Sequence, residues 1–246
     1  MIFSIESADR TKYPDLFDKM FLMRARVFSG RLGWDVKVEN GRETDRFDYE
    51  DPLYLLSLEG RSGQLRGAVR LLPTTGPNML RDAFPVLMPG GTVESPLIWE
   101  SSRFAVNPEI FEARDRAQAN HMVNRTTIEL LGWMVEVAQR AGIDHIVSVF
   151  DASMARIFRS IDCRFDQLGK PVRIGKVMTY AGLFDMSDPM RSRLRAVGGG
   201  LSSRGWSSPS VFGSQIWREC RINSMFTGRL ASGVRRPDEI CFPPRR

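Results

Sequence analysis

The sequence predicts an α/β fold, with a mixed, twisted sheet sandwiched by helices. Short apolar runs of strand length alternate with stretches of helical periodicity as far as about residue 187. The longest helical stretch, residues 117–142, is amphipathic and ends at Gly142, a residue type that commonly terminates helices. Elements that alternate in this way stack in layers, because each must bury its apolar face against another.

The chain begins with a short strand and a helix. The apolar residues 1–5 predict the strand, and helical spacing starts at Pro14, a residue that suits a first helical turn. Gly30 is expected to end this helix. Residues 35–52 are polar and acidic, which predicts a loop that crosses the surface.

A hairpin and a further strand follow. Residues 53–60 and 64–73 are predicted to be two strands around the turn sequence EGRSG. A short helix over residues 78–85 and a Pro- and Gly-rich connector over residues 86–96 then lead to a buried strand at residues 97–106.

After the long helix, the chain is predicted to form a strand at residues 143–150, a helix at residues 152–161 and its last strands within residues 169–186. Beyond residue 187 the composition changes to Arg, Gly and Ser. We therefore divide the chain into one domain of residues 1–187 and a basic C-terminal extension of residues 188–246 that is expected to be partly flexible.

Composition excludes several classes of protein. The N-terminus lacks the features of a signal peptide, and no window approaches the roughly 20 apolar residues that span a bilayer, so we expect a cytoplasmic protein with no membrane partner. Cys163, Cys220 and Cys241 are widely spaced, which favours reduced thiols over disulfides. With only His121 and His145, the sequence offers no metal site and no His-based triad.

The net charge of +6 favours an acidic partner, either nucleic acid, a phosphorylated ligand or an acidic protein. Arg greatly outnumbers Lys, and the planar guanidinium group suits bidentate recognition of carboxylate and phosphate. No nucleic-acid recognition motif is present, so nucleic acid is the least favoured of the three.

The strand sequence IWESSRFAVN, residues 98–107, contains an acid and a base within an apolar run. Glu100 and Arg103 are costly to bury unless they pair or take part in chemistry. In a regular strand, residues three apart lie on opposite faces, so a bulge or a strong twist is needed to bring these two together.

Eight polar and aromatic positions share a fixed spacing. The segments RARVFSGRLGW, DRFD, VRLLPTT and WESSRFAV fill a pattern that resembles the signature of LuxI-type N-acyl-homoserine-lactone synthases, the autoinducer synthases of quorum sensing. The resemblance covers about residues 1–185. The matched positions are Arg24, Phe28, Trp34, Asp45, Asp48, Arg70, Glu100 and Arg103.

This resemblance implies a GNAT-like acyltransferase fold and a two-substrate reaction with no permanently bound cofactor. The amine of S-adenosylmethionine attacks an acyl thioester on acyl carrier protein or coenzyme A. The methionyl carboxylate then closes onto its own γ-carbon, which expels methylthioadenosine and leaves an acylated homoserine lactone.

The resemblance places four of these residues at the reacting atoms. Glu100 is the candidate base, since an α-amino group has a pKa near 7.7–8.0 and needs only a modest acceptor. Arg103 is assigned to the substrate carboxylate, which it would orient for ring closure. Phe28 and Trp34 would face the adenosyl and sulfonium end, because aromatic faces attract cations.

The other four matched residues are expected to surround the substrate. Asp45 and Asp48 lie on the acidic loop, which suits a cationic substrate. Arg24 and Arg70 are expected to pair with these acids and hold the loop over the site, with direct contact to S-adenosylmethionine left open.

The acyl chain is expected between the strands at residues 98–106 and 145–150, over the long helix. Predicted residues of this acyl pocket are Met122, Leu130, Met134, Ser148 and Val149.

The basic surface would dock the acidic acyl carrier protein through electrostatic attraction. Candidate docking residues are Arg156, Arg159, Arg164 and Arg173.

Two alternatives explain less of the sequence. A generic GNAT-type N-acyltransferase that uses acyl coenzyme A would need a Q/R-x-x-G-x-G/A loop for the pyrophosphate, and residues 101–120 lack its glycines. A basic nucleic-acid-binding protein would explain the charge and the C-terminal extension, but not Glu100, Asp45 or Asp48.

Overall fold

A single large sheet organises the chain. In the computed structural model, which describes residues 1–60, 62–109 and 115–198, eight strands form this sheet in the order β1-β4-β5-β6-β7-β10-β8, with β9 also paired to β10. All pairs are antiparallel except β6 with β7. The strands are β1 (Ile2–Glu6), β4 (Leu53–Leu58), β5 (Leu65–Pro73), β6 (Ile98–Val106), β7 (His145–Asp151), β8 (Asp166–Gln167), β9 (Val172–Ile174) and β10 (Val177–Asp185).

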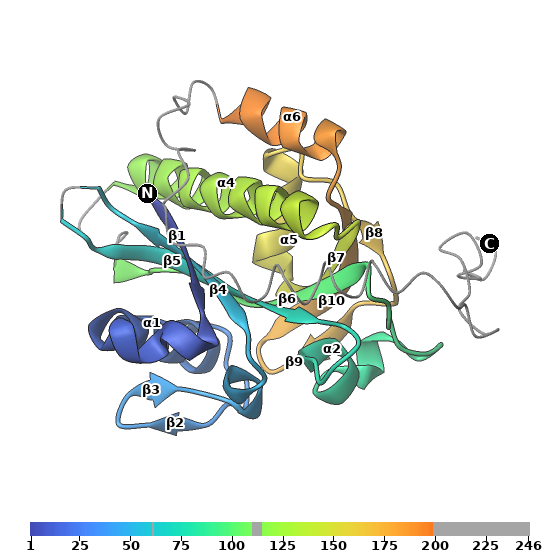
Figure 1. Cartoon of the computed structure of the whole chain (residues 1–246), viewed down its shortest axis with the longest axis horizontal. Coiled ribbons are helices and arrows are strands. Elements are labelled where there is room, and N and C mark those ends of the chain that lie inside the picture. Colours follow the sequence, from blue (N-terminus) through green and yellow to red (C-terminus); the bar gives the residue numbers. More distant parts are fainter. Residues whose placement is uncertain (61, 110–114, 199–246) are drawn as a thin grey trace. The chain divides into compact units, whose positions relative to one another are not determined.

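Helices cover both faces of the sheet, as predicted (Figure 1). We call one face the α4/α5 face, after α4 (Arg116–Ala141) and α5 (Ala152–Ser160). The other is the α1 face, after α1 (Pro14–Ala25), which continues into the π-helical segment η2 (Arg26–Arg31). The α1 face also carries the hairpin of β2 (Val38–Glu39) and β3 (Arg42–Glu43), and α2 (Met79–Asp82). Short 3₁₀ turns lie at Ser7–Lys12, Arg46–Tyr49 and Pro85–Leu87.

The segment predicted to be a surface loop, residues 35–52, contains more structure than expected. Strands β2 and β3 pair through a tight turn in which Asn40 and Gly41 have φ angles of 51° and 75°. Asn-Gly is a strong signal for such a turn, but each strand is only two residues long and polar. The 3₁₀ turn that follows is closed by a capping box between Asp45 and Asp48.

Helix α4 begins and ends where its sequence signals lie. The side chain of Asp115 caps its first turn by accepting a hydrogen bond from the amide of Gln118 at 2.9 Å, and Gly142 ends it with φ 70°. The helix lies over β1, β4 and β5. Two contacts show this position: Trp133 Nε1 donates to Ser4 Oγ of β1 at 2.6 Å, and Leu130 packs over Gly67 of β5.

The described chain continues beyond the predicted domain boundary at residue 187. Helix α6 (Asp188–Val197) packs on α4 and buries Met190 and Leu194 (Figure 1). The rest of the proposed extension, residues 199–246, lies outside the described residues, so the division into 1–187 and 188–246 stays a prediction. Within the part of the chain that the structure describes, no helix has both the length and the apolar character of a membrane span.

Strands β6 and β7 pair in parallel over only four residue pairs and then separate. Their register runs from Ile98 opposite His145 to Ser101 opposite Ser148. On the other side of β6 the register against β5 shifts, so that Arg103 and Phe104 together face Val69. Arg103 has φ 54° at this bulge. The bulge predicted for this strand is therefore confirmed.

Candidate active site

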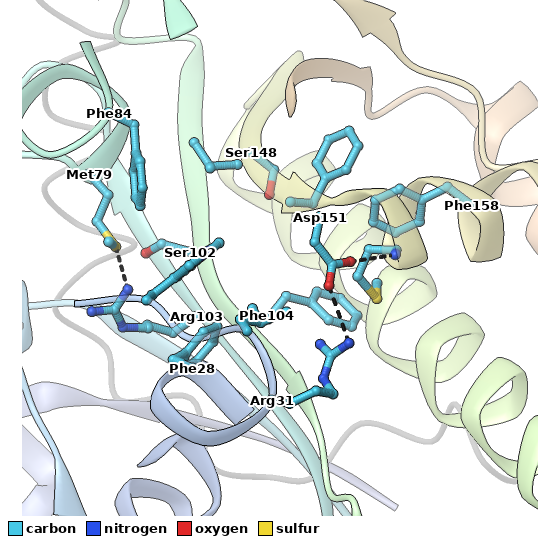
Figure 2. A pocket seen from close by; sticks show the side chains of 15 residues that line it. Phe28, Arg31, Met79, Phe84, Ser102, Arg103, Phe104, Ser148, Asp151 and Phe158 are labelled. Atoms are coloured by element: carbon cyan, nitrogen blue, oxygen red, sulfur yellow. Dashed lines mark hydrogen bonds and ion pairs between the residues drawn. The ribbon is translucent and has the colours of Figure 1, made fainter. Parts of the chain in front are cut away.

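A cavity opens where β6 and β7 separate (Figure 2). It reaches both faces of the sheet, since its lining combines side chains of the α1 face with side chains of the α4/α5 face. From the α1 face come Phe28, Leu32, Trp34, Met79, Phe84, Ser102, Arg103 and Val149. From the other face and the rim come Arg31, Phe104, Ser148, Phe150, Asp151, Met154 and Phe158.

Three arginines and three carboxylates form a buried charge network on the α1 face; its members are Arg24, Arg70, Arg103, Glu43, Asp45 and Asp48. Arg24 of α1 joins two of the acids. Its Nε donates to Glu43 Oε2 at 2.6 Å, and its two terminal nitrogens donate to the oxygens of Asp48 at 2.7 and 3.0 Å. This bidentate geometry fixes the acidic segment against α1.

Arg70 of β5 holds the same segment from the sheet. Its terminal nitrogens donate to Asp45 at 2.5 and 3.1 Å, and one of them also donates to Asp48 at 2.8 Å. Its Nε donates to Ser102 Oγ at 3.1 Å, which ties the network to β6. Asp48 further accepts from the Tyr54 hydroxyl at 2.7 Å. The predicted pairing of Arg24 and Arg70 with the two aspartates is confirmed.

Arg103 faces the network and the cavity together. Its Nη2 lies 2.7 Å from Glu43 Oε1 and 2.8 Å from Asp45 Oδ2. Its Nη1, by contrast, donates to the thioether sulfur of Met79 at 3.3 Å, and sulfur is a weak acceptor. The guanidinium carbon also lies 5.0 Å from the centre of the Phe28 ring. Nη1 is therefore the donor that a ligand in the cavity can recruit.

Opposite charges compensate one another within this network. Burial alone would raise the pKa of Asp48, but Arg24 and Arg70 hold that pKa well below its usual range. Burial lowers the pKa of Arg103, against the opposing effect of Glu43. Removing any one charge would leave its partners buried without compensation.

Glu100 lies on the α1 face behind the cavity rather than on its wall. It is fully buried, and its two oxygens accept hydrogen bonds from the amides of Met79 at 2.9 Å and Leu80 at 2.6 Å. These contacts anchor the first turn of α2 and so place the Met79 thioether next to Arg103. Burial raises the pKa of Glu100 to about 7, although the two amides act in the opposite direction.

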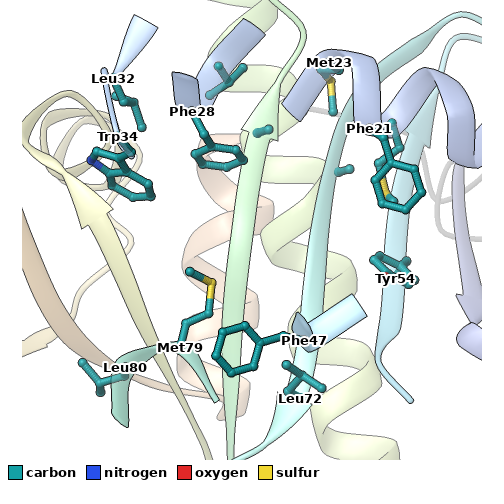
Figure 3. Close-up of a cluster of buried hydrophobic side chains, with 14 of the residues drawn as sticks. Phe21, Met23, Phe28, Leu32, Trp34, Phe47, Tyr54, Leu72, Met79 and Leu80 are labelled. Carbon is teal, nitrogen blue, oxygen red and sulfur yellow. The ribbon is translucent and has the colours of Figure 1, made fainter. Parts of the chain in front are cut away.

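Phe28 and Trp34 stack on each other (Figure 3), and Arg103 lies over the Phe28 ring. Their ring centres are 5.5 Å apart at an interplanar angle of 20°, and the Phe84 ring packs against Trp34 with ring centres 5.4 Å apart. The indole nitrogen of Trp34 is buried and has no hydrogen-bond partner among the described residues. A buried donor of this kind is satisfied when a ligand brings an acceptor.

On the α4/α5 face the lining is mainly aromatic. The rings of Phe104 and Phe158 face the cavity (Figure 2), and Phe150 and Met154 also line it. At the rim, Asp151 caps α5 by accepting from the Met154 amide at 2.7 Å. Its other oxygen accepts from Arg31 of η2 at 3.2 Å, so an ion pair joins the two sides of the opening.

Comparison with known proteins identifies the family of the chain. The family model described as autoinducer synthase matches residues 9–194. An acyl-homoserine-lactone synthase of Rhizobium etli is 40% identical over 183 residues, which cover 73% of this chain and 82% of that protein. The chain belongs to the autoinducer synthase family. The predicted family is thus confirmed, and the protein is an acyltransferase.

Solved structures of the family have the same fold. The crystal structure of the synthase LasI has a TM-score of 0.69 at 28% identity and covers 80% of this chain and 94% of its own. The coenzyme A-dependent synthase BjaI, solved with SAM and isopentyl-CoA, has a TM-score of 0.73 at 26% identity and covers 90% of this chain and 99% of its own. The GNAT-like fold predicted from the sequence is confirmed.

Two of the five predicted acyl-pocket residues, Ser148 and Val149, line the cavity. Met122, Leu130 and Met134 are not among its lining residues, because α4 lies over β1, β4 and β5 rather than over the gap between β6 and β7. That these three residues contact the acyl chain stays a prediction.

Sequence reasoning missed several residues of the site. Glu43, the third carboxylate, lies 60 residues from Arg103 in the chain and had no motif to mark it. The aromatic residues of β7 and α5 were visible only as ordinary core positions.

Among the described residues, no group of His, Cys, Asp and Glu is arranged to hold a metal ion.

Proposed function

We propose that this autoinducer synthase transfers an acyl group from a thioester to the amine of S-adenosylmethionine and then forms the lactone, with release of methylthioadenosine. The observation that supports the proposal most is the cavity between β6 and β7, where stacked aromatic rings meet Arg103 Nη1, which donates only to the weak acceptor Met79 Sδ.

In this proposal S-adenosylmethionine occupies the α1 face of the cavity. The face of Trp34 attracts the sulfonium with roughly 0.5–2 kcal/mol, and its free N–H gives the substrate a hydrogen bond. Phe28 contacts both Trp34 and Arg103 and so sets their relative position. Asp45 and Asp48 act through Arg70 and Arg24, as the support of the site.

Arg103 binds the methionyl carboxylate through Nη1. Its charge is already shared with Glu43 and Asp45, so its hold on a third carboxylate is moderate. That suits the second step, in which a carboxylate oxygen forms a bond to the γ-carbon while the bond from that carbon to sulfur breaks. The sulfonium leaves as a neutral thioether, and no proton is required. Positioning by Arg103 therefore supplies the main assistance.

Glu100 accepts the proton of the amine through one water. Each of its oxygens accepts only one amide hydrogen bond, which leaves further lone pairs free. A pKa of about 7 is close to the value that suits a base at neutral pH. Catalytic hydrogen bonds often tighten only when the substrate binds, so the position of Glu100 behind the cavity wall is compatible with this role.

The reaction is tested by incubating the full chain with S-adenosylmethionine and a series of acyl thioesters. Release of methylthioadenosine together with an acylated homoserine lactone, both identified by mass spectrometry, is the expected result. Acylation of an amine without release of methylthioadenosine would instead point to a generic N-acyltransferase and contradict the proposal.

Acyl carrier protein is the donor that the surface favours. Arg156 and Arg159 lie exposed on α5, Arg164 follows that helix, and Arg173 lies exposed on β9. Helix α5 also contributes Met154 and Phe158 to the cavity, so an acidic partner docked here would present its thioester near the opening. Coenzyme A is the second candidate, because it is the donor of the relative BjaI.

Salt distinguishes the two donors. Transfer from acyl carrier protein is expected to weaken steeply as salt is added, since its docking is electrostatic, whereas transfer from acyl coenzyme A is expected to change little. Equal salt dependence for both donors would contradict docking on these arginines.

Location of the protein in the cytoplasm stays a prediction from the sequence.

A further inference from the structure

The cavity ends on the α4/α5 face against two aromatic rings. Phe150 of β7 and Phe158 of α5 are both buried, and their rings meet edge to face with centres 5.1 Å apart. Both side chains line the cavity (Figure 2). We refer to this pair as the aromatic wall.

The aromatic wall has no room to move back. Phe184 lies behind it, 5.8 Å from Phe150 and 5.2 Å from Phe158 between ring centres. Phe165 lies 5.0 Å from Phe150. At Gly182 of β10, even an added methyl carbon would come within 3.0 Å of the rings of Phe150 and Phe165, so the layer behind the wall is already filled. Cores packed in this way resist the insertion of further methylene groups.

Besides the aromatic wall, this part of the cavity is lined by Phe104 and Met154 and, at the rim, by a polar pair. Asp151 and Arg31 form their ion pair there, and the Asp151 side chain is only 1% exposed. An alkyl chain pushed into this pair would separate the buried Asp151 carboxylate from Arg31, whose side chain is 48% exposed, and a buried charge without its partner is costly. An apolar chain that enters through the gap between β6 and β7 therefore meets the aromatic wall on one side and an ion pair on the other.

We propose that Phe150 and Phe158 limit this enzyme to short acyl chains and are the residues that determine its acyl selectivity. The inference rests on the proposed function, because it concerns the acyl group in the same reaction. The α1 face of the cavity is assigned to S-adenosylmethionine, so the acyl group takes the opposite side, and the distance from the gap to the wall sets its length.

The first experiment compares butanoyl, hexanoyl, octanoyl and dodecanoyl thioesters with the wild-type chain. Each is supplied both as coenzyme A ester and on acyl carrier protein, and methylthioadenosine release is measured. The ratio kcat/KM is expected to be highest for butanoyl or hexanoyl and to fall steeply beyond. Highest activity with dodecanoyl would overturn the inference but leave the proposed function intact. Absence of methylthioadenosine with every donor would instead refute the proposed function.

The second experiment enlarges the pocket with the variants Phe150→Leu and Phe158→Leu. Each is expected to raise the octanoyl-to-butanoyl ratio of kcat/KM by about tenfold or more, since one methylene in a pocket is worth about 10- to 200-fold. The matched control is Phe165→Leu, which lies in the same aromatic layer but does not line the cavity. Phe165 is only half-buried, so this variant should lower stability by less than the wall variants do and should leave the ratio unchanged.

Two outcomes of the second experiment would overturn the inference. One is an unchanged ratio in a wall variant that circular dichroism shows to be folded. The other is an equal shift in Phe165→Leu, which would indicate general loosening of the core. If both wall variants fail to fold, the wild-type series of thioesters still decides whether short chains are preferred.

Discussion

The two halves of the cavity are built on different physical grounds. On the α1 face, direction dominates, because Arg24, Arg70 and Arg103 each fix two or more acceptors at hydrogen-bond distance. On the α4/α5 face, volume dominates, because the rings of Phe150 and Phe158 fill space and make no hydrogen bond. The comparison predicts that the rate of the reaction and the choice of acyl group can be altered separately. Changes in the first half should alter rate or stability, and changes in the second should alter selectivity.

The largest effect is expected for Glu100→Gln. Turnover should fall by about 10²- to 10⁴-fold, the usual contribution of a positioned base. Stability should change much less, since the amide oxygen still accepts one of the two backbone hydrogen bonds. Steady-state kinetics and urea denaturation measure the two effects, and Glu136→Gln, at an ion pair of α4 with Arg140, is the control.

The pH profile sharpens this prediction. Only the carboxylate form accepts a proton, and burial raises the pKa of Glu100 to about 7, so the wild-type rate should fall as the pH drops through about 7. In Glu100→Gln this limb should vanish and leave only the ionisation of the substrate amine. Near-normal turnover in the variant would show that Glu100 is not the base. A changed acyl preference would contradict the prediction that changes on the α1 face leave acyl selectivity unaltered.

Next in size is Arg24→Ala, which leaves Glu43 and Asp48 buried with one cation fewer. The free energy of unfolding should fall by about 3–5 kcal/mol. Arg42→Ala is the matched control, because Arg42 pairs with Asp18 on the surface, where 42% and 40% of the two side chains are exposed. Its effect should stay within about 1 kcal/mol. Equal effects in the two variants would show that the charge network does not stabilise the fold.

Acid should act through the same network. The folded-state pKa of Asp48 is depressed, so its contribution to stability is present above the unfolded value of about 4 and is lost as the pH falls toward the folded value. The free energy of unfolding of the wild type should therefore decrease below about pH 4. Asp48→Asn has lost this contribution already and should show a flatter profile there. Identical profiles in guanidinium titrations at several pH values would contradict this role of Asp48.

The smallest effect is expected for Trp34→Phe. The ring remains but the N–H is lost, and one hydrogen bond contributes about 0.5–1.5 kcal/mol. The KM for S-adenosylmethionine should rise by about two- to tenfold, while the KM for the acyl donor and the acyl preference stay the same. Trp133→Phe is the control, because that indole N–H donates to Ser4 away from the cavity. A shift in acyl preference would show that Trp34 borders the acyl group instead.

Several features of the site could be predicted because they depend on local chemistry. The resemblance to the autoinducer synthases predicted the ion pairs of Arg24 and Arg70 with Asp45 and Asp48, and the structure has them. Two charged residues three apart in one strand required a bulge, which the structure has at Arg103. The Asn40-Gly41 turn has a sequence signal of its own, but only a loop was predicted there because the two strands that flank the turn are polar.

The sequence by itself determined the family, the layered α/β fold and most residues of the charge network, because strand and helix periods, turn signals and charge pairing are properties of short segments. Only the tertiary structure decided that Glu43 completes the network, that Glu100 anchors α2 behind the cavity, and that side chains of α5 rather than α4 line the cavity. These depend on which surfaces meet when distant segments pack, and a side chain carries no local mark of the neighbour it will contact across the sheet.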